Sequence, residues 1–224
     1  MPSANYIVLV FFIAAFVMSV ILHEVAHGWM AARCGDHTAE AAGRLSLNPI
    51  PHIDLFMTIF LPIMLYVASG GTMIFGGAKP VPINPYNFRN LELDDLKVSL
   101  AGVAVNFAIA LVFGFSLHLF APDSVGFTLF TLITIYNLIL SLFNLIPIPP
   151  LDGSHVLRFV IARANHEVAA AYERIGRFGF IFVILLLRFL WRPILASINF
   201  VWFRILAIHD VHWLEVILRF RQSF

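Results

Sequence analysis

Residues 6–33 read YIVLVFFIAAFVMSVILHEVAHGWMAAR, an apolar run that leads without a break into a stretch with two histidines and a glutamate. A helix over about residues 5–33, rising about 1.5 Å per residue, is long enough to cross a bilayer and emerge from it. Residues 1–22 contain no Lys or Arg, so the charged start of a secretory signal peptide is missing. The stretch therefore predicts a retained transmembrane helix that carries polar chemistry in its second half.

The composition of the whole chain agrees with a membrane location. Of the 224 residues, 60% are hydrophobic and 12% charged, and the net charge is +1. Soluble domains have roughly 45–50% apolar and about 25% charged residues, so we expect an all-α multi-pass membrane protein. The charge near zero gives no basic stripe for a nucleic acid. Cys34 is the only cysteine, which excludes an intramolecular disulfide and a zinc site built from cysteines.

Further apolar stretches predict the remaining helices. Strong spans are expected at residues 96–120 and 125–146, joined by a tight turn at 121–124. A shorter helix is predicted over 151–164. The stretch 175–208 is apolar but is interrupted by arginines and a proline, so it predicts either one kinked span or a span followed by an interfacial helix.

A re-entrant or extended segment is predicted between the first and second strong spans. Residues 55–69 form about 15 apolar residues interrupted by Pro62, which is short for a full crossing. Whether this stretch spans or re-enters stays open. Residues 70–90 are rich in Gly, Pro and Asn, and their X-Pro steps favour extended or turn geometry over helix.

The first helix contains the motif His23-Glu24-Val25-Ala26-His27. Residues four apart lie on one face of a helix, so both imidazoles can reach a single metal ion, while Glu24 stands beside that ion and can hold a water molecule. The alternative is a pair of structurally satisfied helix histidines. Burial of these polar groups beside an apolar run is costly without partners, which disfavours that alternative.

Asp152 is the best candidate for a third ligand, because a catalytic zinc usually takes three protein ligands and one water. It follows directly after the prolines that end the third span, in the sequence NLIPIPPLDG at residues 144–153. Irregular backbone is tolerated at membrane depth only inside protein or beside a wet cavity. The alternative role for Asp152 is the N-cap of the helix predicted over 151–164.

Several motifs together resemble the site-2 proteases, a family of intramembrane zinc metalloproteases, in a short form without a PDZ or other added soluble domain. Besides HEVAH and NLIPIPPLDG, the matching blocks are GRLSLNPIPHID (43–54), FGGAKPVPINPYNF (75–88) and AGVAVNFAIA (101–110). They stand in the family's order and cover about residues 20–160. The resemblance implies one zinc ion per chain with ligands His23, His27 and Asp152, and Glu24 as general base.

The resemblance also carries weaker assignments. Asn144 matches the family's asparagine eight residues before the ligand aspartate, a candidate for polarising the scissile carbonyl. Gly102 and Asn106 match the glycine and asparagine of the family's middle-helix motif. Two positions depart from the family, because Gly77 stands where relatives usually have a Trp and Val103 where a Pro is common. These departures put substrate contacts in doubt more than catalysis.

The predicted function is an intramembrane zinc endopeptidase that cuts peptide bonds in or near transmembrane segments of membrane proteins, in regulated intramembrane proteolysis. Its expected partners are a transmembrane protein substrate and the lipid bilayer; the oligomeric state stays open. The substrate helix must unwind locally, and residues 70–88 could pair with the unwound strand. We expect a metalloprotease core at 1–164, C-terminal transmembrane or interfacial helices at 165–224, and a location in a prokaryotic cell (inner) membrane.

Two alternative functions use the same residues. A metal or proton transporter could use the His/Glu/Asp cluster for permeation, but transporters tend to show internal repeats and none is visible. A catalytically inactive scaffold is disfavoured because all the expected catalytic residues are present. The roles of His52, Asp54 and His155 stay open: an interfacial loop role is favoured for the first two, and a contact supporting the metal site or a place at the interface for His155.

Overall fold

The computed structural model describes residues 2–68, 76–176, 179 and 192–222. All regular elements within these ranges are helices, and no strand occurs there. The chain divides into two compact units, one formed by Val17–Gly102 and the other by Met1–Phe16 together with Val103–Phe224. The boundary predicted at residues 164 and 165 stays a prediction.

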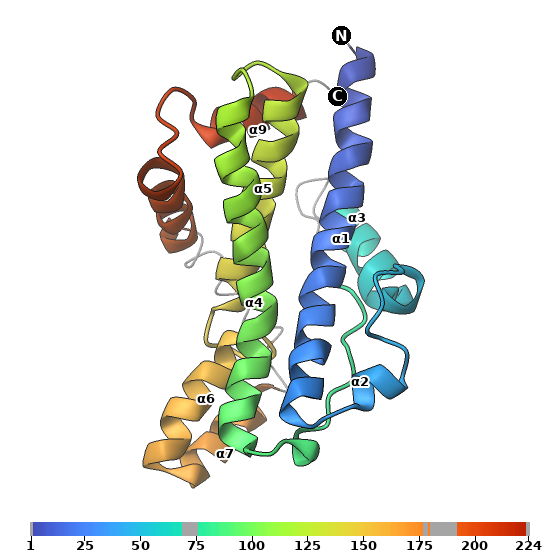
Figure 1. Cartoon of the computed structure of the whole chain (residues 1–224), viewed down its shortest axis with the longest axis vertical. Coiled ribbons are helices and arrows are strands. Elements are labelled where there is room, and N and C mark those ends of the chain that lie inside the picture. Colours follow the sequence, from blue (N-terminus) through green and yellow to red (C-terminus); the bar gives the residue numbers. More distant parts are fainter. Residues whose placement is uncertain (1, 69–75, 177–178, 180–191, 223–224) are drawn as a thin grey trace. The chain divides into compact units, whose positions relative to one another are not determined.

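Among the described residues, three helices are long and apolar enough to cross a membrane, which confirms the all-α multi-pass class (Figure 1). They are α1 (Pro2–Cys34), α4 (Leu91–Ser116, continued by a 3-10 turn over Leu117–Leu119) and α5 (Val125–Asn144). Helix α4 begins five residues before the predicted span. The reason is a local cap, in which the Asn90 side chain accepts from the Leu93 N–H and the Asp94 carboxylate accepts from the Asn90 N–H.

The unit Val17–Gly102 is held together where α1 ends. Asp36 is fully buried, and its carboxylate accepts hydrogen bonds from Thr38, from the Asn84 N–H and from the Asn87 side chain. Burial raises the pKa of Asp36, but the bonds from these three residues outweigh it, so the pKa lies below its ordinary value. The short helix α2 (Thr38–Ala41) follows directly. Asp36 thus links the end of α1 to the distant segment around residue 84.

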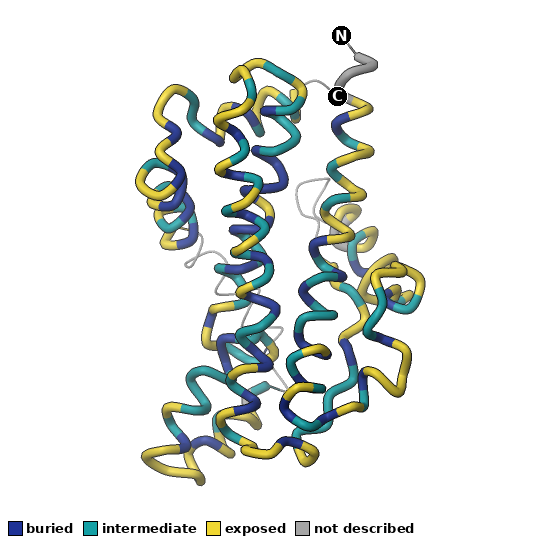
Figure 2. Tube along the Cα trace, in the orientation of Figure 1, coloured by how far each residue is buried: buried dark blue, intermediate teal, exposed yellow. Residues whose placement is uncertain are grey.

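The segment between the first two spans is helical at first and then lacks regular secondary structure, where its X-Pro steps favour extended geometry. A 3-10 turn (Ile50–His52) precedes a π-helical turn (Leu55–Phe60), which runs into α3 (Leu61–Ala68). The residues of Leu55–Phe60 are exposed although most of them are apolar (Figure 2). Residues 76–84 have no regular secondary structure, and a 3-10 turn (Pro85–Asn87) follows them. The predicted lack of helix therefore holds for 76–84; residues 69–75 lie outside the described residues, and membrane re-entry stays a prediction.

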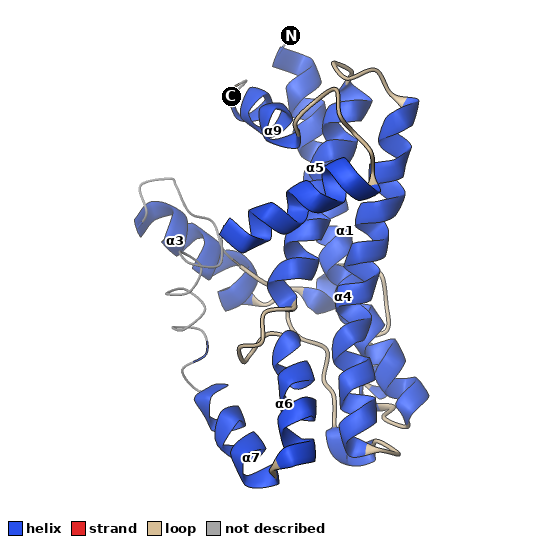
Figure 3. Ribbon diagram, turned by 90° about the vertical axis from the view of Figure 1, so that its left-hand side faces the viewer, coloured by secondary structure: helices blue, strands red, loops and turns tan. Residues whose placement is uncertain are grey.

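The second unit packs around α5. Ser124 caps α5 by accepting from the Phe127 N–H, and the buried face of α5 packs in a core with Ala110, Ile198 and Trp202. The predicted helix after the third span is α6 (Gly153–Ala164), which forms a hairpin with α7 (His166–Ile175; Figure 3).

The C-terminal part of this unit is helical again. Residues 192–200 are helical and are followed by a π-helical turn (Val201–Ile205) and by α9 (Trp213–Arg221). Helix α9 buries Trp213 and Val216 in the same core. The choice between one kinked span and a span plus an interfacial helix at 175–208 falls largely outside the described residues.

Candidate metal centre and active site

The two histidines of the HExxH motif lie against each other on α1. Their rings are 4.5 Å apart between centroids and nearly perpendicular, and the two Nε2 atoms are 2.9 Å apart. Each residue is only 7% exposed. The helical spacing thus does what the sequence predicted, and it brings two imidazole nitrogens together at one buried point.

The protonation of His27 follows from its partner on α4. Its Nδ1 lies 2.7 Å from the carbonyl oxygen of Val98. A carbonyl only accepts, so Nδ1 must carry the proton and donate it, which leaves the lone pair on Nε2. Such a bond to backbone is the usual way in which a protein orients a metal-binding histidine. The sequence could not point to Val98, because any residue supplies a carbonyl.

Gly102 makes room for this histidine pair. A Cβ at this position would lie 2.4 Å from Nε2 of His27 and 2.7 Å from Cε1 of His23, well inside van der Waals contact. The glycine therefore lets the backbone of α4 pass directly over the two rings, the close approach that its motif predicts.

Glu24 is held by the extended segment. Its Oε2 accepts a hydrogen bond of 2.9 Å from the backbone N–H of Val81. Sequence reasoning missed Val81, although a signal was present: both neighbours, Pro80 and Pro82, lack an N–H. Val81 is thus the only one of these three consecutive residues that can donate to a carboxylate.

Asp152 and Asn144 belong to the other unit. Asp152 stands immediately before α6 with helical backbone angles, and its side chain makes no capping hydrogen bond. The N-cap alternative for Asp152 thus lacks its defining bond. The Asn144 side chain donates from Nδ2 to the carbonyl of Leu140, one turn earlier in α5. The assignment of these two residues to the active site stays a prediction.

The less certain polar residues have local partners. Nε2 of His52 donates to the carbonyl of Ser46, and Asp54 caps the π-helical turn by accepting from the N–H groups of Phe56 and Met57. These bonds stabilise the loop and agree with the loop role favoured above.

At Gly77, a Cβ would meet nothing within 4 Å, so the space for a larger residue is open.

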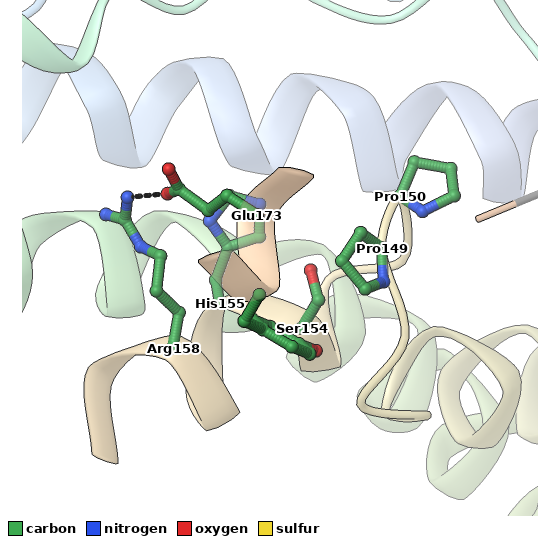
Figure 4. A pocket seen from close by; sticks show the side chains of 7 residues that line it. Pro149, Pro150, Ser154, His155, Arg158 and Glu173 are labelled. Atoms are coloured by element: carbon green, nitrogen blue, oxygen red, sulfur yellow. Dashed lines mark hydrogen bonds and ion pairs between the residues drawn. The ribbon is translucent and has the colours of Figure 1, made fainter. Parts of the chain in front are cut away.

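His155 lines a pocket of about 180 Å³ between α6 and α7 (Figure 4). In this pocket Arg158 forms an ion pair with Glu173. The hydroxyl of Tyr172, another lining residue, donates to the carbonyl of Pro147, and burial raises the pKa of this tyrosine. The hydrogen bond of Tyr172 thus connects the α6–α7 hairpin to the loop that precedes Asp152.

Comparison with known proteins identifies the relatives of this chain. The sequence pattern of peptidase family M50 matches residues 11–126 and 121–187. The protein named "Putative zinc metalloprotease YwhC" from Bacillus subtilis is 35% identical over 185 residues, which cover 79% of each chain. "Putative zinc metalloprotease Rip2" from Mycolicibacterium smegmatis is 32% identical over 191 residues, 83% of this chain and 70% of that one. No solved structure matches the chain significantly.

Proposed function

This chain belongs to peptidase family M50, the family of the site-2 proteases, and is a membrane zinc metalloprotease; we propose that it cuts transmembrane segments of other proteins. The observation that carries the proposed zinc chemistry is the histidine pair of α1, in which the bond to Val98 fixes the proton of His27 on Nδ1. We further propose one zinc ion per chain and a location in the cell membrane of a prokaryote.

The donor atoms fit zinc. Two Nε2 atoms 2.9 Å apart are close to the separation of about 3.3 Å expected for two imidazole nitrogens on one tetrahedral zinc. The close approach of α4 to the two rings is possible only because residue 102 is glycine. His23 and His27 would hold the ion together with Asp152, whose side chain is not used as a helix cap.

The chemistry then follows from the residues of this chain. Bound zinc supplies the Lewis acidity that lets water attack a peptide bond at neutral pH. Oε2 of Glu24 is occupied by the Val81 N–H, so Oε1 takes the proton from the attacking water and passes it to the leaving amide nitrogen. Asn144 has a second amide hydrogen besides the one given to Leu140, and it would donate this hydrogen to the scissile carbonyl.

The substrate class is supported by the extended segment 76–84. The backbone bonds of Gly77, Lys79 and Val81 all go to partners within the unit. In extended chain the alternate residues turn their carbonyls the other way, so the carbonyls of Ala78, Pro80 and Pro82 can accept from an added strand, to which Ala78 can also donate its N–H. A transmembrane helix that has unwound locally offers such a strand, whereas a folded helix keeps its peptide groups bonded to itself.

Glu24→Gln tests the proposal. The amide is the same size and still accepts the Val81 N–H, but it cannot take a proton. We expect the cleavage rate of a peptide with one transmembrane span, in detergent micelles, to fall by about 10²–10⁴-fold while zinc per chain is unchanged. Glu40→Gln is the matched control, because Glu40 is exposed on α2 and bonds to His37. Cleavage that survives Glu24→Gln contradicts the mechanism, and zinc flux into vesicles without cleavage would favour a transporter.

A further inference from the structure

Arg44 is a buried cation with an unusual partner. It is 7% exposed, its Nη2 donates to the backbone carbonyl of Lys79 at 2.7 Å, and its Nε has no hydrogen-bond partner among the described residues. Gly43, with φ +66°, turns the chain after α2 and directs Arg44 inward. Burial of a guanidinium is costly and gives little stability by itself. The bond to Lys79 therefore calls for a role beyond stability.

Lys79 is fixed on both of its backbone groups. Its N–H donates to the carbonyl of His52 at 2.8 Å, and its carbonyl accepts from Arg44. Two residues later, the Val81 N–H donates to Glu24. Since the period of an extended chain is two residues, the position of Lys79 determines which residue faces the Glu24 carboxylate.

The prolines make that register critical. Val81 stands between Pro80 and Pro82, so a slip of one residue in either direction places a proline opposite Glu24. Proline has no N–H, and the carboxylate would then lose its donor. We propose that Arg44 is a positioning residue, which holds the Lys79 carbonyl so that the Val81 N–H stays on the Glu24 carboxylate. This inference rests on the proposed function, because it assigns Arg44 an effect on the residue that takes the proton.

The test replaces each end of this connection separately. Arg44→Met keeps an apolar stem and removes the donor. Val81→Pro removes the N–H at a position between two prolines. Arg33→Met is the matched control, because it removes the same charge from the same unit. The Cζ atom of Arg33 lies over the Trp29 ring, 3.9 Å from the ring centroid. The assay is cleavage of the peptide with one transmembrane span, with kcat, KM, zinc per chain and the unfolding midpoint measured for each variant.

We expect Arg44→Met and Val81→Pro each to lower kcat by about 10–100-fold, the size of one lost hydrogen bond to a charged group. KM and zinc content should stay within about twofold, Arg44→Lys should recover part of the rate, and Arg33→Met should match wild type. The double variant should be little slower than either single variant, since both changes act on one contact.

Three results would overturn the proposal: an unchanged kcat in Arg44→Met, rate losses that multiply in the double variant, or a loss of rate that follows a loss of zinc. If Arg44→Met does not fold, Arg44→Lys and its combination with Val81→Pro make the same comparison. Failure here is distinguishable from failure of the proposed function, because wild-type cleavage and its loss in Glu24→Gln do not depend on Arg44.

Discussion

Gly102→Ala should damage the proposed zinc site although it adds a single methyl group. The new Cβ would lie 2.4 Å from Nε2 of His27, about 1 Å closer than the 3.4 Å at which ordinary contact begins. Neither neighbour can yield easily. If α4 moved away by that distance, the bond of 2.7 Å between His27 Nδ1 and the Val98 carbonyl would be lost, because Val98 lies one turn earlier in the same helix.

The size of the effect follows from this geometry. Loss of the bond that orients a metal-binding histidine typically costs 10–100-fold in metal affinity, and a displacement of 1 Å at a reacting centre can cost about 10²-fold in rate. We expect a zinc affinity about 10–100-fold weaker, measured by competition with a chelator, and a kcat/KM about 100-fold lower at saturating zinc.

Gly114→Ala is the matched control. It lies in the same helix and gains the same helix propensity of about 1 kcal/mol, but its Cβ would meet the end of the Leu206 side chain rather than an imidazole. This variant should keep the zinc affinity of wild type. If Gly102→Ala binds zinc and cleaves as well as Gly114→Ala does, the argument that Gly102 makes room for the histidine pair is wrong.

Two further predictions concern carboxylates. Asp152→Ala should release zinc, whereas Asp54→Ala should keep it and lose only about 1 kcal/mol of stability as a cap; elemental analysis decides, and the reverse pattern would exclude Asp152 as a ligand. Asp36→Asn should lower the free energy of unfolding by about 2 kcal/mol at neutral pH, because three residues donate to a charged acceptor. The folded pKa of Asp36 is lowered, so its stabilising contribution is present above the unfolded value of about 3.9 and is lost as pH falls through the folded value. Thermal unfolding midpoints of wild type should therefore approach those of Asp36→Asn in acid, and a constant gap between the two would contradict this.

Local patterns made the spans and the histidine pair predictable. Length and hydropathy suffice to predict a membrane-spanning helix such as α5. The spacing of His23 and His27 suffices to place both on one face of their helix. The start of α4 was predicted late, because the acidic first turn is polar and its cap depends on Asn90 rather than on apolar residues. The non-helical nature of 76–84 was predictable because proline acts within its own dipeptide.

The contacts that orient the site were not predictable, because they join backbone groups far apart in the chain. The Val98 carbonyl is 71 residues from His27, and the Val81 N–H is 57 residues from Glu24. Every non-proline residue carries the same two groups, so the partner's identity leaves no mark in the sequence. A residue that lacks a backbone N–H or a Cβ, in contrast, can be recognised from the sequence.

Pro80 and Pro82 lack an N–H, which makes Val81 the donor, and Gly102 lacks a Cβ, which lets α4 cover the imidazoles. These residues constrain the site by excluding alternatives, since each leaves one register or one helix separation possible. The same reasoning explains why a buried Arg44 is useful despite the cost of its desolvation: Val81 is the only donor among residues 80–82, so a slip of one residue removes the bond to Glu24, and Arg44 opposes that slip by holding the Lys79 carbonyl. Substitutions at the two prolines should accordingly be tolerated while Arg44 is present, because the register then has a second determinant.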